Sequence, residues 1–352
     1  MSDRLQDIQA FLDISASNGT VPGAVAEIGQ GPTVLGRFTA GSALINGGNP
    51  RPIQSNTIFD MASVTKVTVT LPLILRLAEQ GHLSLEDPVS TYIPEFSGGA
   101  KDQVTLANLL VHNGGLLWHR EYFRFLSGYD QIVSAAIAEP LTTDPNREVV
   151  YSDLDFILLG EVVRRVSDKS LAECAKEEIF DVVGMPETFY KPAEELNSRI
   201  AATEVMADGK AKVGIVHDDN TEAMGGESGH AGLFSTVSDM GRYLREWVNP
   251  EGQLLRWSTR IASVMRRTGS LPASRGWGWV LRGDGHDCLG DLWPQSSASH
   301  TGYTGTSVAF DLKTGIWSVL LTNRVHFGRD HNIASFRRRY HNLVMSVLSH
   351  DY

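Results

Sequence analysis

The segment Phe59-Asp60-Met61-Ala62-Ser63-Val64-Thr65-Lys66, which continues into Val67-Thr68-Val69-Thr70-Leu71, is the stretch on which the fold prediction rests. It has a serine and a lysine three residues apart at the start of a predicted helix, so both side chains share one face. The Ser63 hydroxyl would lie beside the Lys66 ammonium, near free backbone N–H groups and the positive end of the helix dipole. This position suits a serine nucleophile with a lysine to hold or accept its proton. Alone, the motif favours a capping serine and a solvated lysine.

Two later segments change that balance. In Tyr151-Ser152-Asp153-Leu154, Ser152 is predicted to cap a helix that starts at Asp153, and Tyr151 can point its phenol into a cleft as a general acid or base. In His300-Thr301-Gly302-Tyr303-Thr304-Gly305-Thr306, a small residue, a hydroxyl and unpaired backbone N–H groups offer the parts of an oxyanion hole and a carboxylate clamp. Taken singly, these segments read as a helix cap and as a Gly-rich turn before a strand.

The three motifs in this order resemble those of the serine β-lactamase and penicillin-binding-protein superfamily. The Tyr-x-Asx motif in the middle is similar to that of class C β-lactamases, their esterase relatives and the DD-peptidases of that branch. Residues 83–96, 104–116 and 229–235 also resemble segments of these proteins, and the similarity runs from about residue 20 to residue 325.

The resemblance implies an acyl-enzyme on Ser63, with Lys66, Tyr151 and His300 completing the catalytic set. Lys66 would hold or take the serine proton, Tyr151 would pass a proton to the leaving group, and His300 would support Tyr151 electrostatically. The backbone N–H groups of Ser63 and Tyr303 would hold the oxyanion. Either Lys66 or Tyr151 can be the base, since the two would titrate as a coupled pair. The substrate-binding residues implied are Asp153, Thr301, Gly302 and Tyr303.

The chain departs from the family pattern in three places. Asp153 stands where many relatives have Asn, and an ionised Asp can accept a hydrogen bond but not donate one. His300 replaces the Lys of Lys-Thr-Gly, so the charge there depends on its environment. A literal Lys313-Thr314-Gly315 is rejected as the site because it falls in a predicted hairpin loop, whereas the family motif opens a strand, as we expect of His300-Thr301-Gly302.

Strands early and late in the chain, with helices between, predict an α/β (α+β) fold of the β-lactamase/transpeptidase type. We expect an antiparallel sheet flanked by N- and C-terminal helices, with a mostly helical subdomain inserted. One catalytic unit, 1–352, would divide into an α/β subdomain, 1–66 and 236–352, and a helical subdomain, 67–235. Pro72 should kink the helix that follows Ser63 or break one of its backbone bonds. The predicted strands are 21–29, 33–38, 276–281, 307–311 and 316–321, and the predicted helices are 3–17, 104–111, 129–138, 154–166, 171–180, 237–247 and 332–348.

The composition of this 352-residue chain limits the kinds of molecule that it is expected to bind. A net charge of −10 argues against nucleic acid and against an anionic membrane surface. No secretory signal is visible, which predicts a cytoplasmic protein with Cys174 and Cys288 as reduced thiols. His217-Asp218-Asp219 and His230 match no familiar metal-ligand spacing, so neither a metal nor a cofactor is expected. The Arg337-Arg338-Arg339 run is predicted to be a solvated helix face.

The expected reaction is hydrolysis of an ester or amide in a small molecule or peptide. A carboxylesterase or a D-amino-acid peptidase or amidase ranks above a dedicated β-lactamase. The alternatives are a penicillin-binding sensor that does not turn over and a metal hydrolase that uses His217 and His230. The oligomeric state is left open.

Overall fold

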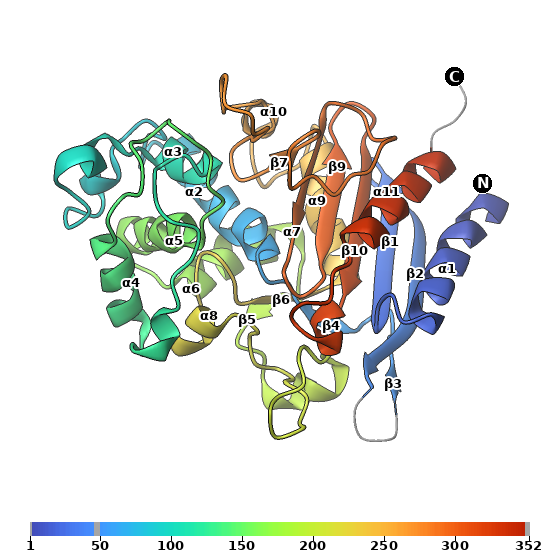
Figure 1. Cartoon of the computed structure of the whole chain (residues 1–352). Coiled ribbons are helices and arrows are strands. Elements are labelled where there is room, and N and C mark those ends of the chain that lie inside the picture. The colour runs from blue at the N-terminus through green and yellow to red at the C-terminus, as the bar shows by residue number, and fades with distance from the viewer. Residues whose placement is uncertain (1, 46–49, 349–352) are drawn as a thin grey trace.

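The computed structural model describes residues 2–45 and 50–348, and a seven-stranded antiparallel sheet joins the two ends of this chain (Figure 1). The strand order is β3-β2-β1-β10-β9-β8-β7. β1 lies beside β10, with Ala24 opposite Thr322, so the early and late parts of the chain share one sheet. The bounds are β1 Gly23–Gln30, β2 Thr33–Leu44, β3 Arg51–Pro52, β7 Val280–Leu281, β8 Ser297–Thr301, β9 Ser307–Asp311 and β10 Ile316–Thr322.

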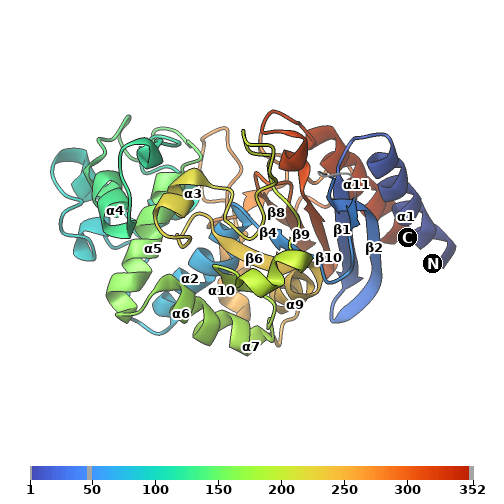
Figure 2. The same ribbon diagram turned by 90° about the horizontal axis from the view of Figure 1, so that it is seen from below.

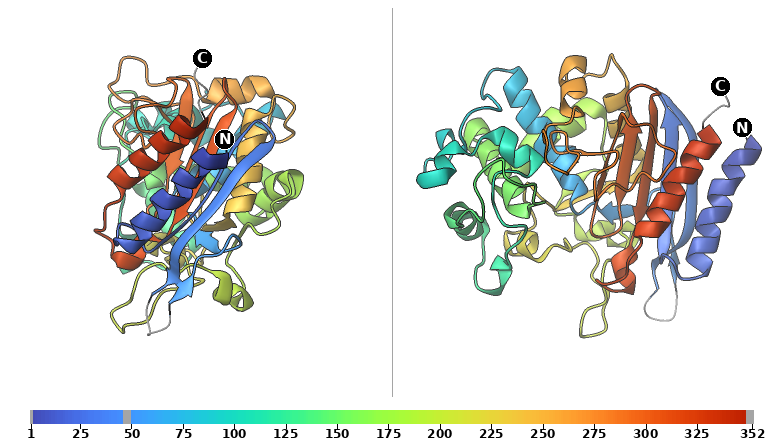
Figure 3. Two further views of the ribbon diagram at one scale, coloured as in Figure 1. Left: turned by 90° about the vertical axis from the view of Figure 1, so that its right-hand side faces the viewer. Right: turned by 45° about the horizontal axis from the view of Figure 1, so that its top comes forward.

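Helices cover both faces of this sheet, because its central strands are apolar on both sides. α1 (Ser2–Ser17) and α11 (Ala334–Leu348) lie side by side on one face, where Ile8 and Tyr340 pack with Leu320 of β10 (Figure 3). α9 (Val237–Val248) packs on the other face, against Leu321 and the strands β1, β9 and β10. The predicted antiparallel sheet flanked by terminal helices is confirmed.

The middle of the chain is mostly helical and lies beside the sheet (Figure 2). α4 begins and ends where predicted, and α5 matches its prediction within a residue at each end. The predicted helix 171–180 is divided into α6, a π-helical turn η5 and α7. The bounds are α3 Leu106–Val111, α4 Tyr129–Ala138, α5 Asp153–Ser167, α6 Leu171–Ala175, η5 Lys176–Phe180, α7 Asp181–Val183, α8 Asp219–Ala223 and α10 Trp257–Ser263.

The helix after Ser63 changes its hydrogen-bond register before Pro72. Lys66–Thr70 form a π-helical turn, η1, and α2 (Leu71–Glu79) follows with Pro72 in its first turn. The Leu71 N–H donates to the Lys66 carbonyl, a step of five residues. Proline has no N–H to donate, so Pro72 was predicted to kink this helix or to break one of its backbone hydrogen bonds. The wider π-helical turn just before Pro72 accommodates that lost bond.

Four strand predictions were wrong or incomplete. His300 and Thr301 close β8 instead of opening a strand, because the chain turns at Gly302 to enter β9. Only the last two residues of the predicted strand 276–281 pair with a neighbour. The predicted strand 33–38 is too short, because β2 continues to Leu44. A second sheet went unpredicted, in the order β4-β6-β5, with bounds β4 Ile58–Asp60, β6 Leu233–Thr236 and β5 Phe189–Tyr190.

Other predictions agree with the structure. Lys313-Thr314-Gly315 lies in the β9–β10 turn, where Gly315 adopts a φ of 69°. Cys174 and Cys288 are buried free thiols. Among residues 2–45 and 50–348, no helix combines the length and the apolar character needed to cross a membrane.

Candidate active site

Ser63 lies in a turn between β4 and η1 whose backbone is held from both sides. The residue before it, Ala62, has a φ of 47°, an uncommon conformation for a residue with a side chain. Asp60 Oδ1 accepts the Ala62 N–H at 2.8 Å, and the hydroxyls of Thr304 and Thr306 donate to the carbonyls of Asp60 and Met61 at 2.7 and 3.0 Å. The turn after β8 is therefore tied directly to the Ser63 turn.

Lys66 is fully buried, and its ammonium meets three acceptors. Nζ donates to Ser63 Oγ at 3.2 Å, to Asp153 Oδ1 at 2.7 Å and to the His230 carbonyl at 3.1 Å. Burial alone would lower the pKa of Lys66, but the Asp153 carboxylate and the Tyr151 phenol outweigh it and raise the pKa above its ordinary value. Lys66 is therefore an ammonium at neutral pH, with a proton directed at the Ser63 hydroxyl.

Asp153, the first residue of α5, is engaged through both carboxylate oxygens. Oδ1 accepts from Lys66, and Oδ2 lies 3.2 Å from His119 Nδ1. Burial would raise the pKa of Asp153, but Lys66 and then His119 hold it well below its usual range. The hydrogen bond to Asp153 in turn raises the pKa of His119. Asp153 is thus an anion that balances the charge of Lys66.

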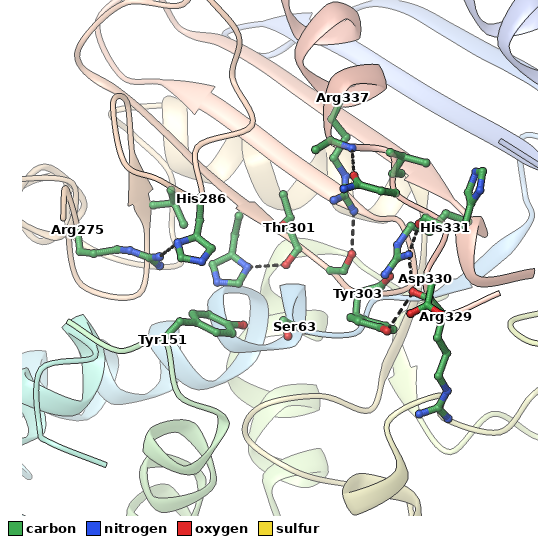
Figure 4. Close-up of a pocket in the computed structure, with 17 residues that line it drawn as sticks. Ser63, Tyr151, Arg275, His286, Thr301, Tyr303, Arg329, Asp330, His331 and Arg337 are labelled. Carbon is green, nitrogen blue, oxygen red and sulfur yellow. Dashed lines mark hydrogen bonds between the residues drawn. The ribbon is translucent and has the colours of Figure 1, made fainter. Parts of the chain in front are cut away.

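Tyr151 points its phenol toward Ser63 (Figure 4). Its ring lies 4.7 Å from the ring of buried His112, and Lys66 Nζ lies 5.0 Å from the Tyr151 ring centre. The predicted cap is present, since the Ser152 hydroxyl accepts the Asp155 N–H at 3.3 Å and donates to the Leu117 carbonyl at 2.7 Å. The cap fixes the start of α5 and so fixes Tyr151 immediately before it.

His300 is buried at the end of β8, with its ring centre 6.1 Å from that of Tyr151. Its Nδ1 lies 3.0 Å from the Thr301 carbonyl, an acceptor, so Nδ1 carries the proton. Burial, together with Lys66 and Arg275, lowers the pKa of His300 to about 3. His300 is therefore a neutral imidazole at neutral pH, and its Nε2 is buried without a hydrogen-bond partner among residues 2–45 and 50–348.

Gly302 allows β8 to approach the Ser63 turn closely. A Cβ atom at this position would lie 2.1 Å from Thr306 Oγ1 and 2.5 Å from the Met61 carbonyl oxygen. The backbone N–H groups of Ser63 and Tyr303 donate to no acceptor within the described residues. These two free N–H groups, on either side of the contact, can donate hydrogen bonds to a developing oxyanion.

A cavity of about 390 Å³ opens beside Ser63 and Tyr151, and four arginines contribute to its lining (Figure 4). Arg324 and Arg337 donate to backbone carbonyls, and neither forms an ion pair within residues 2–45 and 50–348. The prediction that residues 337–339 form a solvated helix face is wrong for Arg337. Its side chain turns in from α11 and donates to the carbonyls of Gly302 and Thr306. The arginine, histidine and aspartate residues of the lining are Arg275, His286, His300, Arg324, Arg329, Asp330, His331 and Arg337.

Asp153, Asp218 and His230 each bring one potential ligand atom within 4.8 Å of the others. His230 Nε2 lies 3.0 Å from Asp218 Oδ1, and the Lys66 ammonium lies against both Asp153 and the His230 carbonyl. The Lys66 ammonium already supplies a cation at Asp153, so a protein side chain balances the charge of that carboxylate.

The structure thus brings Ser63, Lys66, Tyr151, Asp153 and His300 together, with Thr301, Gly302 and Tyr303 in the adjoining turn. The sequence analysis assigned no site role to Arg275, Arg337 or His119. No local pattern marks them, since they come from a loop, a terminal helix and a segment before α5 that meet only in the folded protein.

This fold and site define a serine hydrolase. The model of the Beta-lactamase family matches residues 6–343, and the chain belongs to that family. A protein of Escherichia coli K12 named as a D-alanyl-D-alanine carboxypeptidase is 27% identical over 320 residues, 81% of this chain and 73% of its own length.

Solved structures share the fold. EstCE1, described as a hydrolase with promiscuous acyltransferase activity, superposes with a TM-score of 0.78 at 20% identity and covers 98% of each chain. A class C beta lactamase from Rhodobacter sphaeroides gives a TM-score of 0.74 at 20% identity, over 97% of this chain and 99% of its own.

Proposed function

We propose that this hydrolase forms an acyl-enzyme on Ser63 and cleaves an ester or amide whose leaving group carries a carboxylate, as a C-terminal D-amino acid does. The observation that carries the proposal is one cavity that holds Ser63 and Tyr151 beside uncompensated arginines. The relatives named as D-alanyl-D-alanine carboxypeptidases support the same substrate class.

In the proposed acylation, Ser63 Oγ attacks the substrate carbonyl carbon while Tyr151, as phenolate, takes the hydroxyl proton. Lys66 has three acceptors and a raised pKa, so it favours the phenolate as an ammonium and is not the resting base. The N–H groups of Ser63 and Tyr303 hold the oxyanion, a contribution worth about 3–4 kcal/mol per donor.

Collapse of the oxyanion breaks the bond to the leaving oxygen or nitrogen, which takes the proton from Tyr151. Water then attacks the acyl carbon, gives a proton to Tyr151, and displaces Ser63 Oγ, which recovers that proton. The acid product leaves, and the enzyme returns to its starting protonation state. Every proton in this cycle passes through Tyr151.

The arginines support an anionic leaving group. Arg324 is buried, yet its donors go to the carbonyls of Tyr303, Arg329 and His331. Burial, and to a lesser degree Arg324, lowers the pKa of Arg337 to about 10, as expected for two nearby cations without an acid between them. A substrate carboxylate in the cavity would relieve that repulsion.

A matched pair of substrates tests the proposal. One acyl group is joined through the same ester bond to a leaving group with a free carboxylate or with that carboxylate methylated. We expect kcat/KM to be at least about tenfold higher for the free carboxylate, and Ser63→Ala to abolish turnover of both. Equal rates would overturn the leaving-group assignment, and turnover by Ser63→Ala would overturn the nucleophile.

A chromogenic cephalosporin and a fluorescent penicillin complete the panel. Fast cephalosporin turnover would favour a β-lactamase, and stable acylation without turnover would favour a penicillin-binding sensor. Preference for the methylated ester would favour a carboxylesterase. A cytoplasmic location stays a prediction, checked by fractionating cells that express the protein.

A further inference from the structure

His300, which stands in place of the lysine of a Lys-Thr-Gly motif, carries no charge. The protonated Nδ1 donates to the Thr301 carbonyl, and Nε2 is buried with no hydrogen-bond partner among the described residues. A charged imidazolium would need an acceptor at both nitrogens, and no carboxylate faces Nε2 within the described residues. A cation acting on Tyr151 from this side must therefore come from another residue.

Arg275 lies in the loop before β7 and faces Tyr151 from that side. Its side chain is buried, with 2% exposed, and its guanidinium carbon lies 5.8 Å from the Tyr151 ring centre. Arg275 lines the same cavity as Ser63 and His300 (Figure 4). Nη1 of Arg275 is buried and has no hydrogen-bond partner in the part of the chain that the structure describes.

The loop holds this guanidinium in place. Nε and Nη2 of Arg275 lie 3.3 Å from the two oxygens of Asp284, and Nη2 lies 3.2 Å from His286 Nδ1. Asp284 is itself fixed, because it accepts the backbone N–H groups of Ser274 and His286 at 2.8 and 2.9 Å. Asp284 and His286 both lie in the segment just after β7, so hydrogen bonds from the far side of this strand hold the guanidinium beside Tyr151.

We propose that Arg275 is a positioning residue that supplies Tyr151 with the positive charge absent from His300. The inference rests on the proposed role of Tyr151 in accepting the Ser63 proton. Arg275 holds Tyr151 in the form that accepts this proton, and Lys66 acts on Tyr151 from the η1 side at 5.0 Å. The other titratable groups around Tyr151 are His112, Asp153, Asp155, Asp284, His286 and His300.

The test measures the pH dependence of the rate at which a fluorophosphonate labels Ser63, which needs no knowledge of the natural substrate. The acid limb of this rate reports proton loss from the group that accepts the Ser63 proton. In Arg275→Gln we expect the limb to move up by about one pH unit, and labelling at pH 7 to slow by about tenfold. Arg275→Lys, or Arg275→Gln/His300→Lys, should return the acid limb to its pH in the wild type.

Arg282→Gln is the matched control, because Arg282 pairs with Asp287 at 3.0 Å in the next part of the loop and does not line the cavity. Its limb should match that of the wild type. If Arg275→Gln fails to fold because Asp284 loses its partner, Arg275→Gln/Asp284→Asn replaces it.

Restoration of the limb by either lysine variant supports the proposal. An unmoved limb in the glutamine variant, or a limb that neither lysine restores, overturns it. Wild-type protein that takes no label at Ser63 would instead overturn the proposed function, so the two failures can be told apart.

Discussion

The ion pair between Lys66 and Asp153 links the stability of this protein to its chemistry. Lys66 is fully buried and lies 2.7 Å from Asp153 Oδ1, whereas the Asp153 side chain is 16% exposed. At an effective dielectric constant of about 20, two unit charges at this separation attract by roughly 6 kcal/mol, part of which offsets the loss of hydration. Asp153→Asn leaves a buried ammonium uncompensated, so we expect it to lower the free energy of unfolding at pH 7 by about 3–5 kcal/mol.

The opposite substitution should cost less. Lys66→Met leaves an Asp153 that is still partly exposed and still meets His119 at 3.2 Å. We expect a loss of about 1–2 kcal/mol from this variant. The double variant Lys66→Met/Asp153→Asn removes both charges, so the two losses should not add, and the coupling energy should be at least about 2 kcal/mol.

The penalty in Asp153→Asn should also depend on pH. In the wild type, the raised pKa of Lys66 makes the pair fully stabilising below the unfolded value of about 10.4, and the stabilisation is lost as pH rises through the folded pKa. Without the carboxylate, burial lowers the pKa of Lys66 below the unfolded value. The unfolded state then binds more protons between the two values, so the penalty should shrink as pH rises from 7 to 9.5.

Urea unfolding at both pH values, followed by fluorescence and by circular dichroism with coincident transitions, measures these energies. Lys176 and Asp181 form the control pair, with the same 2.7 Å separation but side chains 67% and 58% exposed. Asp181→Asn should change stability by less than about 1 kcal/mol. A coupling energy below about 1 kcal/mol, or equal losses in Asp153→Asn and Asp181→Asn, would refute the electrostatic account of Lys66.

Two further predictions concern acid stability and the Ser63 turn. Burial and Arg337 lower the pKa of His341 to about 3, so between that value and about 6.5 the unfolded state binds a proton that the folded state does not. The free energy of unfolding should therefore fall with decreasing pH. In urea unfolding at pH 4–6, His341→Gln should reduce the dependence of this free energy on pH by up to about 1.4 kcal/mol per pH unit. His82→Gln, at an exposed position, should leave the dependence unchanged. Gly302→Ala forces a Cβ against Thr306 and the Met61 carbonyl, and it should slow fluorophosphonate labelling at least about tenfold. Gly285→Ala, which meets no atom within 4 Å, should label at the wild-type rate, and equal rates for both variants would contradict the close approach.

Local patterns were sufficient for most regular elements. Apolar periodicity located α4 and α5 because amphipathic helices repeat their buried face every three to four residues. Continuous apolar runs located β9 and β10, which are buried on both faces. The short strands β4 and β6 were not predicted, because they are three and four residues long and are defined as strands only by pairing with each other. The subdomain division at residues 66/67 and 235/236 stays a prediction.

By itself, the sequence determined the family, the antiparallel sheet shared by both ends of the chain, and the candidates Ser63, Lys66, Tyr151 and His300. Each candidate stands in a short motif, and spacing within a motif is a local property. The charge states were decided only by the tertiary structure. Lys66 is charged because Asp153, 87 residues later, lies against it, and His300 is neutral because its folded surroundings exclude water and contain other cations. Burial and the distances between charges govern ionisation, and both exist only once segments far apart in the chain have packed together.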